Sequence, residues 1–198
     1  LKNIWLLLFW VCTGFMSVAQ SNISIIHSTN GYGSSFRWVY DITQDDYGFM
    51  WFANHTGLRR YDGQQYLTYQ HDNSKPNSLS TNTIFKVASG ANHTIWAFGS
   101  DSVFNKLDLK TGTIEHISRF IHDQKELPSF EFELKQFATL SSGEFILLLN
   151  HNNTDNQQVK STIWRYDAEK NGFVHETDIG QSIHYFTESK DGKIWLWG

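Results

Sequence analysis

The stretch "DDYGFMWFANHTGLRRYDG", residues 45–63, carries the pattern that decides the fold. Asp46 and Gly48 predict a turn, which leads into an aromatic-rich strand that ends near Trp51. A loop that contains a glycine and a second apolar segment follow, before another turn at Asp62-Gly63. Short apolar segments separated by turns of this kind indicate antiparallel β-strands, so we asked whether the unit recurs.

The half of the unit that runs from the turn into the strand occurs four times. Its copies are "YGFMWFA" (47–53), "NHTIWAFG" (92–99), "SGEFILLL" (142–149) and "DGKIWLWG" (191–198). The residues that anchor these strands, Trp51, Trp96, Ile146 and Trp195, are separated by 45, 50 and 49 residues. A period of this length indicates a repeat protein, in which each unit is one supersecondary element.

Each complete unit is expected to hold four short strands. In the first unit these strands are predicted at about 37–43, 48–53, 58–61 and 64–69. Four strands at a period of roughly 40–50 residues are typical of a propeller blade. The sequence therefore predicts an all-β fold, a β-propeller fragment of about three and a half four-stranded antiparallel blades whose ring is not closed. The anchor tryptophans are expected to fill the core between neighbouring blades.

The N-terminus predicts an exported protein. Lys2 precedes the apolar segment Ile4 to Cys12, and Ser17-Val18-Ala19 forms a small-x-small cleavage site. The segment is far shorter than the roughly 20 residues that span a bilayer. The predicted parts are a signal peptide (1–19), an N-terminal segment (20–36) in which 21–28 is a possible ring-closing strand, blade 1 (37–76), blade 2 (77–125), blade 3 (126–180) and the first half of blade 4 (181–198).

The first unit resembles the two-component regulator propeller repeat. The matching residues are Asp46 and Gly48, Trp51, Gly57-Leu58, Arg60 to Gly63, and the linker Asn77 to Ser80. The match is weaker later in the chain, where Ser102-Val103 replaces Gly-Leu and Ile146 replaces Trp. The resemblance covers about residues 30 to 198. It implies a segment of the periplasmic sensor region of a bacterial hybrid two-component regulator, whose full chain carries a histidine kinase and dimerises.

The resemblance implies a function in sensing, with a small carbohydrate or oligosaccharide as ligand and the remaining blades of the same chain as partner. Because three and a half blades cannot close a ring, we expect the sequence to be part of a longer protein. Two alternatives stay open: a secreted propeller hydrolase or lyase that acts on polysaccharide, and a protein-interaction scaffold. Residues beyond 198 would discriminate between them.

The long connections predict where a ligand would bind. In a four-stranded meander the second-to-third loops and the linkers between blades lie at one end, which we call the linker face; it holds the linkers 70–82 and 119–133 and the insert 150–160. Loops on a rigid scaffold commonly carry binding residues. The candidate ligand-binding residues on this face are Arg37, Trp38, Asn54, His55, Asp101, His151 and Asn152.

Other chemistry is not indicated by the sequence. The net charge is −4 without a basic block, so we expect this segment not to contact nucleic acid. The nine histidines form no His-Glu-x-x-His motif, and no nucleotide-binding loop or nucleophile motif occurs. We therefore expect a non-catalytic segment with no catalytic residues, no metal site and no cofactor. The stretch 46–51 resembles part of a sialidase Asp-box, which stabilises a turn and does not indicate catalysis.

Overall fold

A computed structural model describes residues 38–127, 132–152 and 159–198, all of which belong to one compact unit, Ser34–Gly198. The predicted signal peptide and the possible ring-closing strand 21–28 lie outside the described residues. Every regular element in the described ranges is a β-strand, as the sequence predicts. No helix in these ranges is long and apolar enough to cross a membrane.

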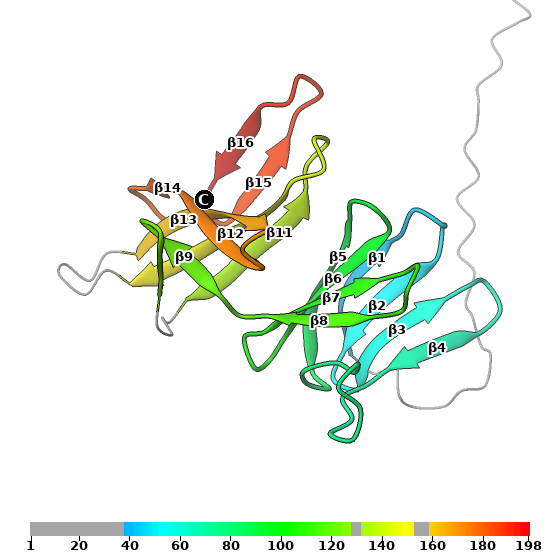
Figure 1. Ribbon diagram of the computed structural model, residues 1–198. Coiled ribbons are helices and arrows are strands. Elements are labelled where there is room, and N and C mark those ends of the chain that lie inside the picture. The colour runs from blue at the N-terminus through cyan, green and yellow to red at the C-terminus, as the bar shows by residue number, and fades with distance from the viewer. Residues whose placement is uncertain (1–37, 128–131, 153–158) are drawn as a thin grey trace, which may run out of the picture. The chain divides into compact units, whose positions relative to one another are not determined.

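The first two sheets are antiparallel four-stranded meanders whose strands follow the chain order (Figure 1). The first sheet consists of β1 (Val39–Gln44), β2 (Met50–Asn54), β3 (Gly57–Tyr61) and β4 (Tyr66–Tyr69). The second consists of β5 (Ile84–Gly90), β6 (Thr94–Gly99), β7 (Phe104–Asp108) and β8 (Ile114–Ile117). Both sheets match the blade pattern predicted from the sequence.

The third sheet has six strands because the linker that precedes it adds two short strands to its edge. Its meander is formed by β11 (Glu133–Thr139), β12 (Phe145–Asn152), β13 (Val159–Asp167) and β14 (Gly172–Ile179), and the hairpin β9 (Phe120–His122) and β10 (Lys125–Glu126) lies at its edge. Strand β9 pairs in parallel with β14. Residues 120–125 were expected in the second blade, whereas their hydrogen bonds place them in the third sheet. The fourth sheet consists of β15 (Tyr185–Glu188) and β16 (Ile194–Trp197).

The turn that opens the first repeat is organised by Asp45 and not by the expected Asp46. One carboxylate oxygen of Asp45 accepts the backbone N–H groups of Tyr47 and Phe49, both at 2.9 Å. The other oxygen accepts the indole N–H of Trp51 at 2.7 Å, and both residues are buried. Asp46 is exposed and lies 3.5 Å from the His93 ring. Asp45 therefore couples the turn to the anchor tryptophan of the following strand.

A second aspartate recurs at the turn between the third and fourth strands. Asp62, Asp108 and Asp167 each accept two backbone N–H groups from residues two and three positions later. These bonds lower the pKa of Asp62 and Asp108, because backbone N–H groups favour the ionised carboxylate. The recurring aspartate, which is followed directly by glycine only at Asp62-Gly63, is thus a turn-forming element.

The core lies between neighbouring sheets. Trp51 packs with residues of the second sheet, Trp96 with residues of the third, and Ile146 with Phe186 of the fourth. These three anchors are 0%, 2% and 4% exposed, which confirms the predicted role of the anchors between blades. Trp195, at the equivalent position of the fourth sheet, is 60% exposed.

The first strands of the four sheets form the inner edge of the array, since β1 contacts β5, β5 contacts β11, and β11 contacts β15. Side chains connect these strands to the backbone of the next sheet. The Asp41 carboxylate accepts the Val87 N–H at 3.0 Å. The Gln136 amide accepts the Phe186 N–H at 2.9 Å and donates to the Phe186 carbonyl at 3.1 Å.

The first two linkers also contact the outer edge of the sheet that follows them. The Asn77 amide donates to the Gly112 carbonyl at 3.1 Å, and its oxygen accepts the Ile114 N–H at the start of β8. In the third sheet the β9–β10 hairpin has the same position against β14, where the Phe173 N–H donates to the Arg119 carbonyl at 2.8 Å.

Candidate ligand-binding site

The predicted binding residues lie on three separate sheets at the linker face. Trp38 precedes β1 and is 65% exposed, and Val39 pairs with Asn54, so Trp38 lies near Asn54 and the exposed His55. Asp101 is exposed in the loop between β6 and β7. His151 is half-buried near the end of β12. Arg37 lies outside the described residues, as does the side chain of Asn152.

Asn54 forms the β2–β3 turn. Its side-chain oxygen accepts both the backbone N–H and the hydroxyl of Thr56 at 2.7 Å. The residue is fully buried, and its side-chain nitrogen has no hydrogen-bond partner among the residues that the structure describes. Gly57 completes the turn at φ 123°, where a Cβ atom would lie 2.1 Å from the Tyr69 carbonyl oxygen. Asn54 thus fixes the loop that presents His55.

His151 and Asp101 have different local roles. The Nδ1 atom of His151 is buried and forms no hydrogen bond with any residue in the described ranges. The carboxylate of Asp101 accepts the Val103 N–H at 3.2 Å, which shapes its own loop. No interaction between these two residues and the Trp38 group is seen in the described part of the chain. The predicted set therefore separates into one local group around Trp38 and two isolated positions.

The inner strands carry a feature that the sequence analysis missed. The pairing of β1 with β2 shifts by one residue between Val39 and Asp41, and the pairing of β5 with β6 shifts at the same place. The pairing of β11 with β12 shifts there too. A β-bulge inserts one unpaired residue and redirects its side chain, and bulges are over-represented next to active sites.

The bulge residues are Tyr40, Phe85 and Lys135, and His184 has the equivalent position in the fourth sheet. Together with Trp38 they form what we call the inner rim. Each of the four stands eleven residues before the anchor of its sheet, a spacing that could have revealed them once the anchors were aligned. They lie at the start of the inner strands, close to the linker face.

Aromatic side chains of the inner rim are open to solvent. Tyr40 is 47% and Phe85 42% exposed, and their rings meet edge to face with 5.5 Å between centroids. The exposure of Phe85 is informative because sheets pack against both faces of its own sheet. Its ring therefore lies at the open inner edge. Lys135 is paired with the Glu133 carboxylate at 2.6 Å, so its charge is neutralised locally.

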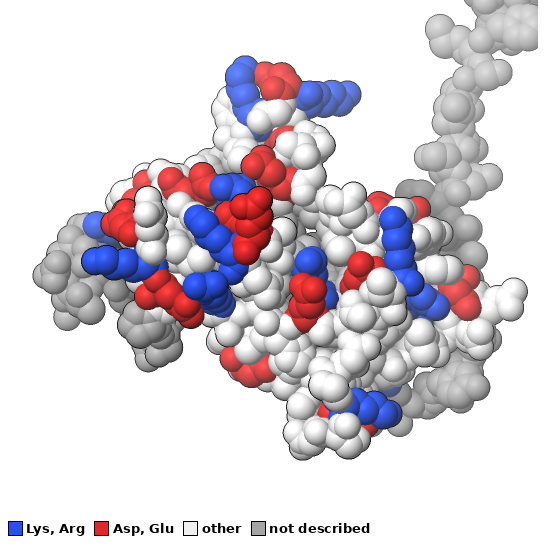
Figure 2. All heavy atoms as spheres, viewed as in Figure 1, with Lys and Arg blue, Asp and Glu red and all other residues white. Residues whose placement is uncertain are grey.

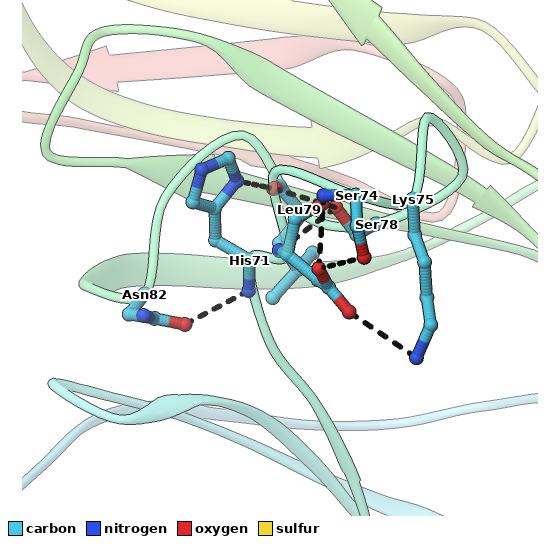
Figure 3. A network of polar contacts seen from close by, with 7 residues as sticks. His71, Ser74, Lys75, Ser78, Leu79 and Asn82 are labelled. Carbon is cyan, nitrogen blue, oxygen red and sulfur yellow. Dashed lines mark hydrogen bonds and ion pairs between the residues drawn. The ribbon is translucent and has the colours of Figure 1, made fainter.

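The first linker of the linker face is held by its own polar groups (Figure 3). The His71 ring forms a hydrogen bond with the Leu79 carbonyl at 2.6 Å. The backbone N–H of His71 donates to the side-chain oxygen of Asn82 at 2.8 Å. The Asp72 carboxylate accepts the Ser74 hydroxyl at 2.6 Å and lies 3.2 Å from the Lys75 ammonium. The Ser74 bonds, followed by Lys75, lower the pKa of Asp72 to about 2.

A hollow of about 670 Å³ is lined by residues of this linker, among them Gln70, Asp72 and Asn77. The side chains of all three already form hydrogen bonds within the protein. The hollow is therefore a surface of a pre-formed loop whose polar groups are used for structure. No group of three or more His, Cys, Asp or Glu that could hold a metal ion occurs among the described residues.

Charges of both signs are mixed on the surface shown in Figure 2, without a field of one sign. Several are arranged in pairs, such as Arg165 with Glu176 and Arg119 with Glu126, both at 2.7 Å. This arrangement differs from the basic stripe that nucleic-acid-binding domains present. What the candidate surface offers is aromatic rings beside amide and hydroxyl groups.

Solved structures share this fold. The chain aligns with the extracellular domain of the putative one component system BT4673 from B. thetaiotaomicron at a TM-score of 0.51 and 16% identity, over 80% of this chain. It aligns with the WD40 β-propeller domain of Doa1 at a TM-score of 0.52 and 12% identity, again over 80% of this chain. The chain is built of propeller blades. No protein-family model and no curated protein sequence matches it.

The propeller fold places the inner rim at the inner edge of an array of blades. The chain covers 22% of the BT4673 structure and 47% of the Doa1 structure. At these identities the similarity establishes the blade architecture and the order of the strands. It agrees with the fold that the resemblance to the two-component regulator propeller repeat implies.

Proposed function

We propose that this chain is a ligand-sensing propeller segment of a periplasmic receptor in two-component signal transduction, and that its ligand is a carbohydrate. The exposed rings of the inner rim are the observation that supports a sugar ligand. Trp38, Tyr40 and Phe85 present large apolar faces to solvent at the linker face. Aromatic rings stack on the apolar face of a sugar, and the exposed His55, held by the buried Asn54 turn, lies close to Trp38 along the sheet.

The sensing role is supported by the extracellular domain of BT4673, which has the same blade architecture. Export is supported by the signal peptide predicted at 1–19. A sensor transmits a signal only if its ligand binds two conformations with different affinity. The role of the segment is therefore binding without turnover of the ligand, and the kinase belongs to another part of the receptor.

Further blades of the same chain are the partner that fits the fourth sheet. Three anchors are covered by the next sheet, whereas Trp195, Trp197 and Tyr185 are 60%, 48% and 57% exposed. A further blade that packed against β15 and β16 would cover these rings as the second sheet covers Trp51. Dimerisation of the full receptor is part of the same proposal.

The proposal is tested with a glycan array followed by titration of the strongest ligand. Phe85→Ala and Tyr40→Ala are expected to weaken binding roughly two- to tenfold each, the equivalent of about 0.5–1.5 kcal/mol for an aromatic contact. Tyr47→Ala is the matched control, because Tyr47 is equally exposed but belongs to the turn between β1 and β2 at the opposite end.

Three results would overturn the proposal. If no glycan binds, or if Tyr47→Ala weakens binding as much as Phe85→Ala, the inner rim is not a sugar site. If the bound oligosaccharide is cleaved during the assay, the chain is a hydrolase or lyase and not a sensor. Chromatography of the glycan after incubation separates binding from turnover.

A further inference from the structure

A second hollow lies between the second and third sheets, at the end of the sheets opposite the linker face. Its volume is about 400 Å³, within the range of roughly 300–1,000 Å³ typical of small-molecule pockets. Residues from both sheets line it: Asn92, Trp96, Lys106 and Asp108 from the second, and Glu144 and Tyr166 from the third. This hollow is separate from the inner rim and contains none of the residues assigned to ligand binding above.

The equivalent place between the first and second sheets is filled. There the rings of Tyr47 and His93 stack with 4.7 Å between centroids and 16° between planes. Counted from the anchors, Asn92 stands where Tyr47 does and Gly143 where His93 does. Two rings are thus replaced by an amide and a glycine, and Gly143 lies close to Ala91. The hollow is the space that a ring fills in the preceding pair of sheets.

The hollow also contains an unused hydrogen-bond donor. In the first sheet the indole N–H of Trp51 donates to Asp45, six residues earlier. Six residues before Trp96 stands Gly90, which offers no carboxylate. Trp96 is 2% exposed and lines the hollow, and no hydrogen bond from its indole N–H is found among residues 38–127, 132–152 and 159–198. The Trp96 indole nitrogen is not among the buried side-chain atoms without a partner in the described part of the chain, so its N–H is open to the hollow and can donate to a group bound there.

The remaining polar groups of the hollow include donors and acceptors. The Lys106 ammonium lies 3.3 Å from Glu115 and 5.2 Å from the centre of the Tyr166 ring. Although burial alone would lower it, the pKa of Lys106 is raised, because Tyr166 and Glu115 favour the ammonium form. Asp108 and Glu144 contribute carboxylates, but one oxygen of Asp108 already accepts two backbone N–H groups and one oxygen of Glu144 already accepts the Ser142 hydroxyl, so only the other oxygen of each can serve a ligand. Lys106 lies beside Glu115, and Arg165 lies 3.8 Å from Glu144, so charges around the hollow are paired and we expect it to favour a neutral ligand over an ionised one.

We propose that this hollow is a second binding site that takes one neutral sugar ring. Sugar hydroxyls both accept and donate hydrogen bonds, so they can accept from Trp96 and Asn92 and donate to Asp108 and Glu144. The ring would occupy the space that Tyr47 and His93 fill in the preceding pair of sheets. This inference rests on the proposed function, since it extends carbohydrate binding to a second place on the same segment.

The test is a titration of the full chain with D-glucose, D-galactose and D-glucuronate, followed by the indole N–H signals in ¹⁵N-correlated NMR spectra. Trp96→Phe identifies the Trp96 signal. We expect a saturable shift of that signal with a neutral sugar, and binding at least about tenfold weaker for D-glucuronate. Asn92→Tyr places a ring at the position equivalent to Tyr47, although at a left-handed φ of 58° that a tyrosine adopts only with strain, and is expected to abolish the shift.

The control variant is Phe85→Ala, which alters the inner rim and should leave the Trp96 shift unchanged. If Phe85→Ala removes the oligosaccharide binding of the proposed function while the Trp96 shift persists, the two sites are independent. If neither neutral sugar shifts the Trp96 signal, or if Asn92→Tyr leaves the shift intact, the second site is refuted while the inner rim is unaffected. Circular dichroism of Asn92→Tyr shows whether the variant is folded.

Discussion

Replacement of Asp45 by alanine should strongly destabilise the protein. The side chain accepts three hydrogen bonds, two from backbone N–H groups of its own turn and one from the indole of Trp51. Water can replace the backbone partners in part, because Tyr47 is 52% exposed. Trp51 is fully buried, so its indole N–H would stay without a partner, at a cost of about 1–3 kcal/mol.

With the two turn bonds included, we expect Asp45→Ala to lower the free energy of unfolding by about 3–5 kcal/mol. For a chain of this length, this corresponds to a fall in Tm on the order of 10 °C. Asp45→Asn should cost less, about 1–3 kcal/mol, because the amide retains an acceptor for the turn but places a donor against the indole.

The measurement is urea unfolding followed by tryptophan fluorescence and by circular dichroism, which together report whether the transition is two-state. Asp46→Asn is the matched control, since Asp46 is its exposed neighbour, and we expect a change of less than about 0.5 kcal/mol. If Asp45→Ala unfolds within 1 kcal/mol of the parent, as a rough limit, or if Asp46→Asn costs as much, the carboxylate is not the link between turn and anchor.

Three further predictions concern the turns and the core. Gly57→Ala should cost more than about 2 kcal/mol, because φ is 123° and the new Cβ would clash with the Tyr69 carbonyl, whereas Gly180→Ala, with open space around it, should be nearly neutral in the same urea assay. Trp96→Ala should cost about 3–5 kcal/mol and Trp195→Ala much less, since the first ring is 2% and the second 60% exposed; equal losses in thermal unfolding would contradict the assignment of the core. The pKa of Asp72 is lowered to about 2, so its stabilising effect is present above the unfolded pKa near 3.8 and is lost as the pH falls toward 2. Urea midpoints between pH 5 and pH 2 should therefore fall less steeply in Asp72→Asn, and parallel curves would show that this carboxylate does not contribute.

The blade pattern was predictable because it rests on local chemistry. Trp51 and Trp96 stand at a regular spacing, and an aspartate recurs at the turn between the third and fourth strands of each of the first three sheets. The choice between Asp45 and Asp46 was not predictable, because both precede Gly48 and only the geometry of the turn decides which carboxylate reaches the indole. The β9–β10 hairpin was missed for a similar reason, since the sequence shows two short apolar segments but not the sheet with which they pair.

In the candidate sites, too, some residues could be predicted from the sequence and others could not. Trp38 could be selected because it stands at the start of a predicted inner strand. Tyr40 and Phe85 were missed because a bulge depends on how two strands pair and has no characteristic residue type that the sequence would show. The hollow beside Trp96 exists because two turns, 50 residues apart along the repeat, have Asn92 and Gly143 where the preceding pair of sheets has two rings. It becomes visible only when the sheets are stacked.

The bonds of Asn77 have a consequence for the behaviour of the protein in concentrated solution. Its amide occupies backbone groups at the outer edge of the second sheet, and the β9–β10 hairpin does so for the third. An exposed strand edge recruits foreign strands and leads to aggregation. Because these two linkers occupy backbone groups at the edges of the blades they lead into, we expect the second and third blades to resist self-association even without a closed ring.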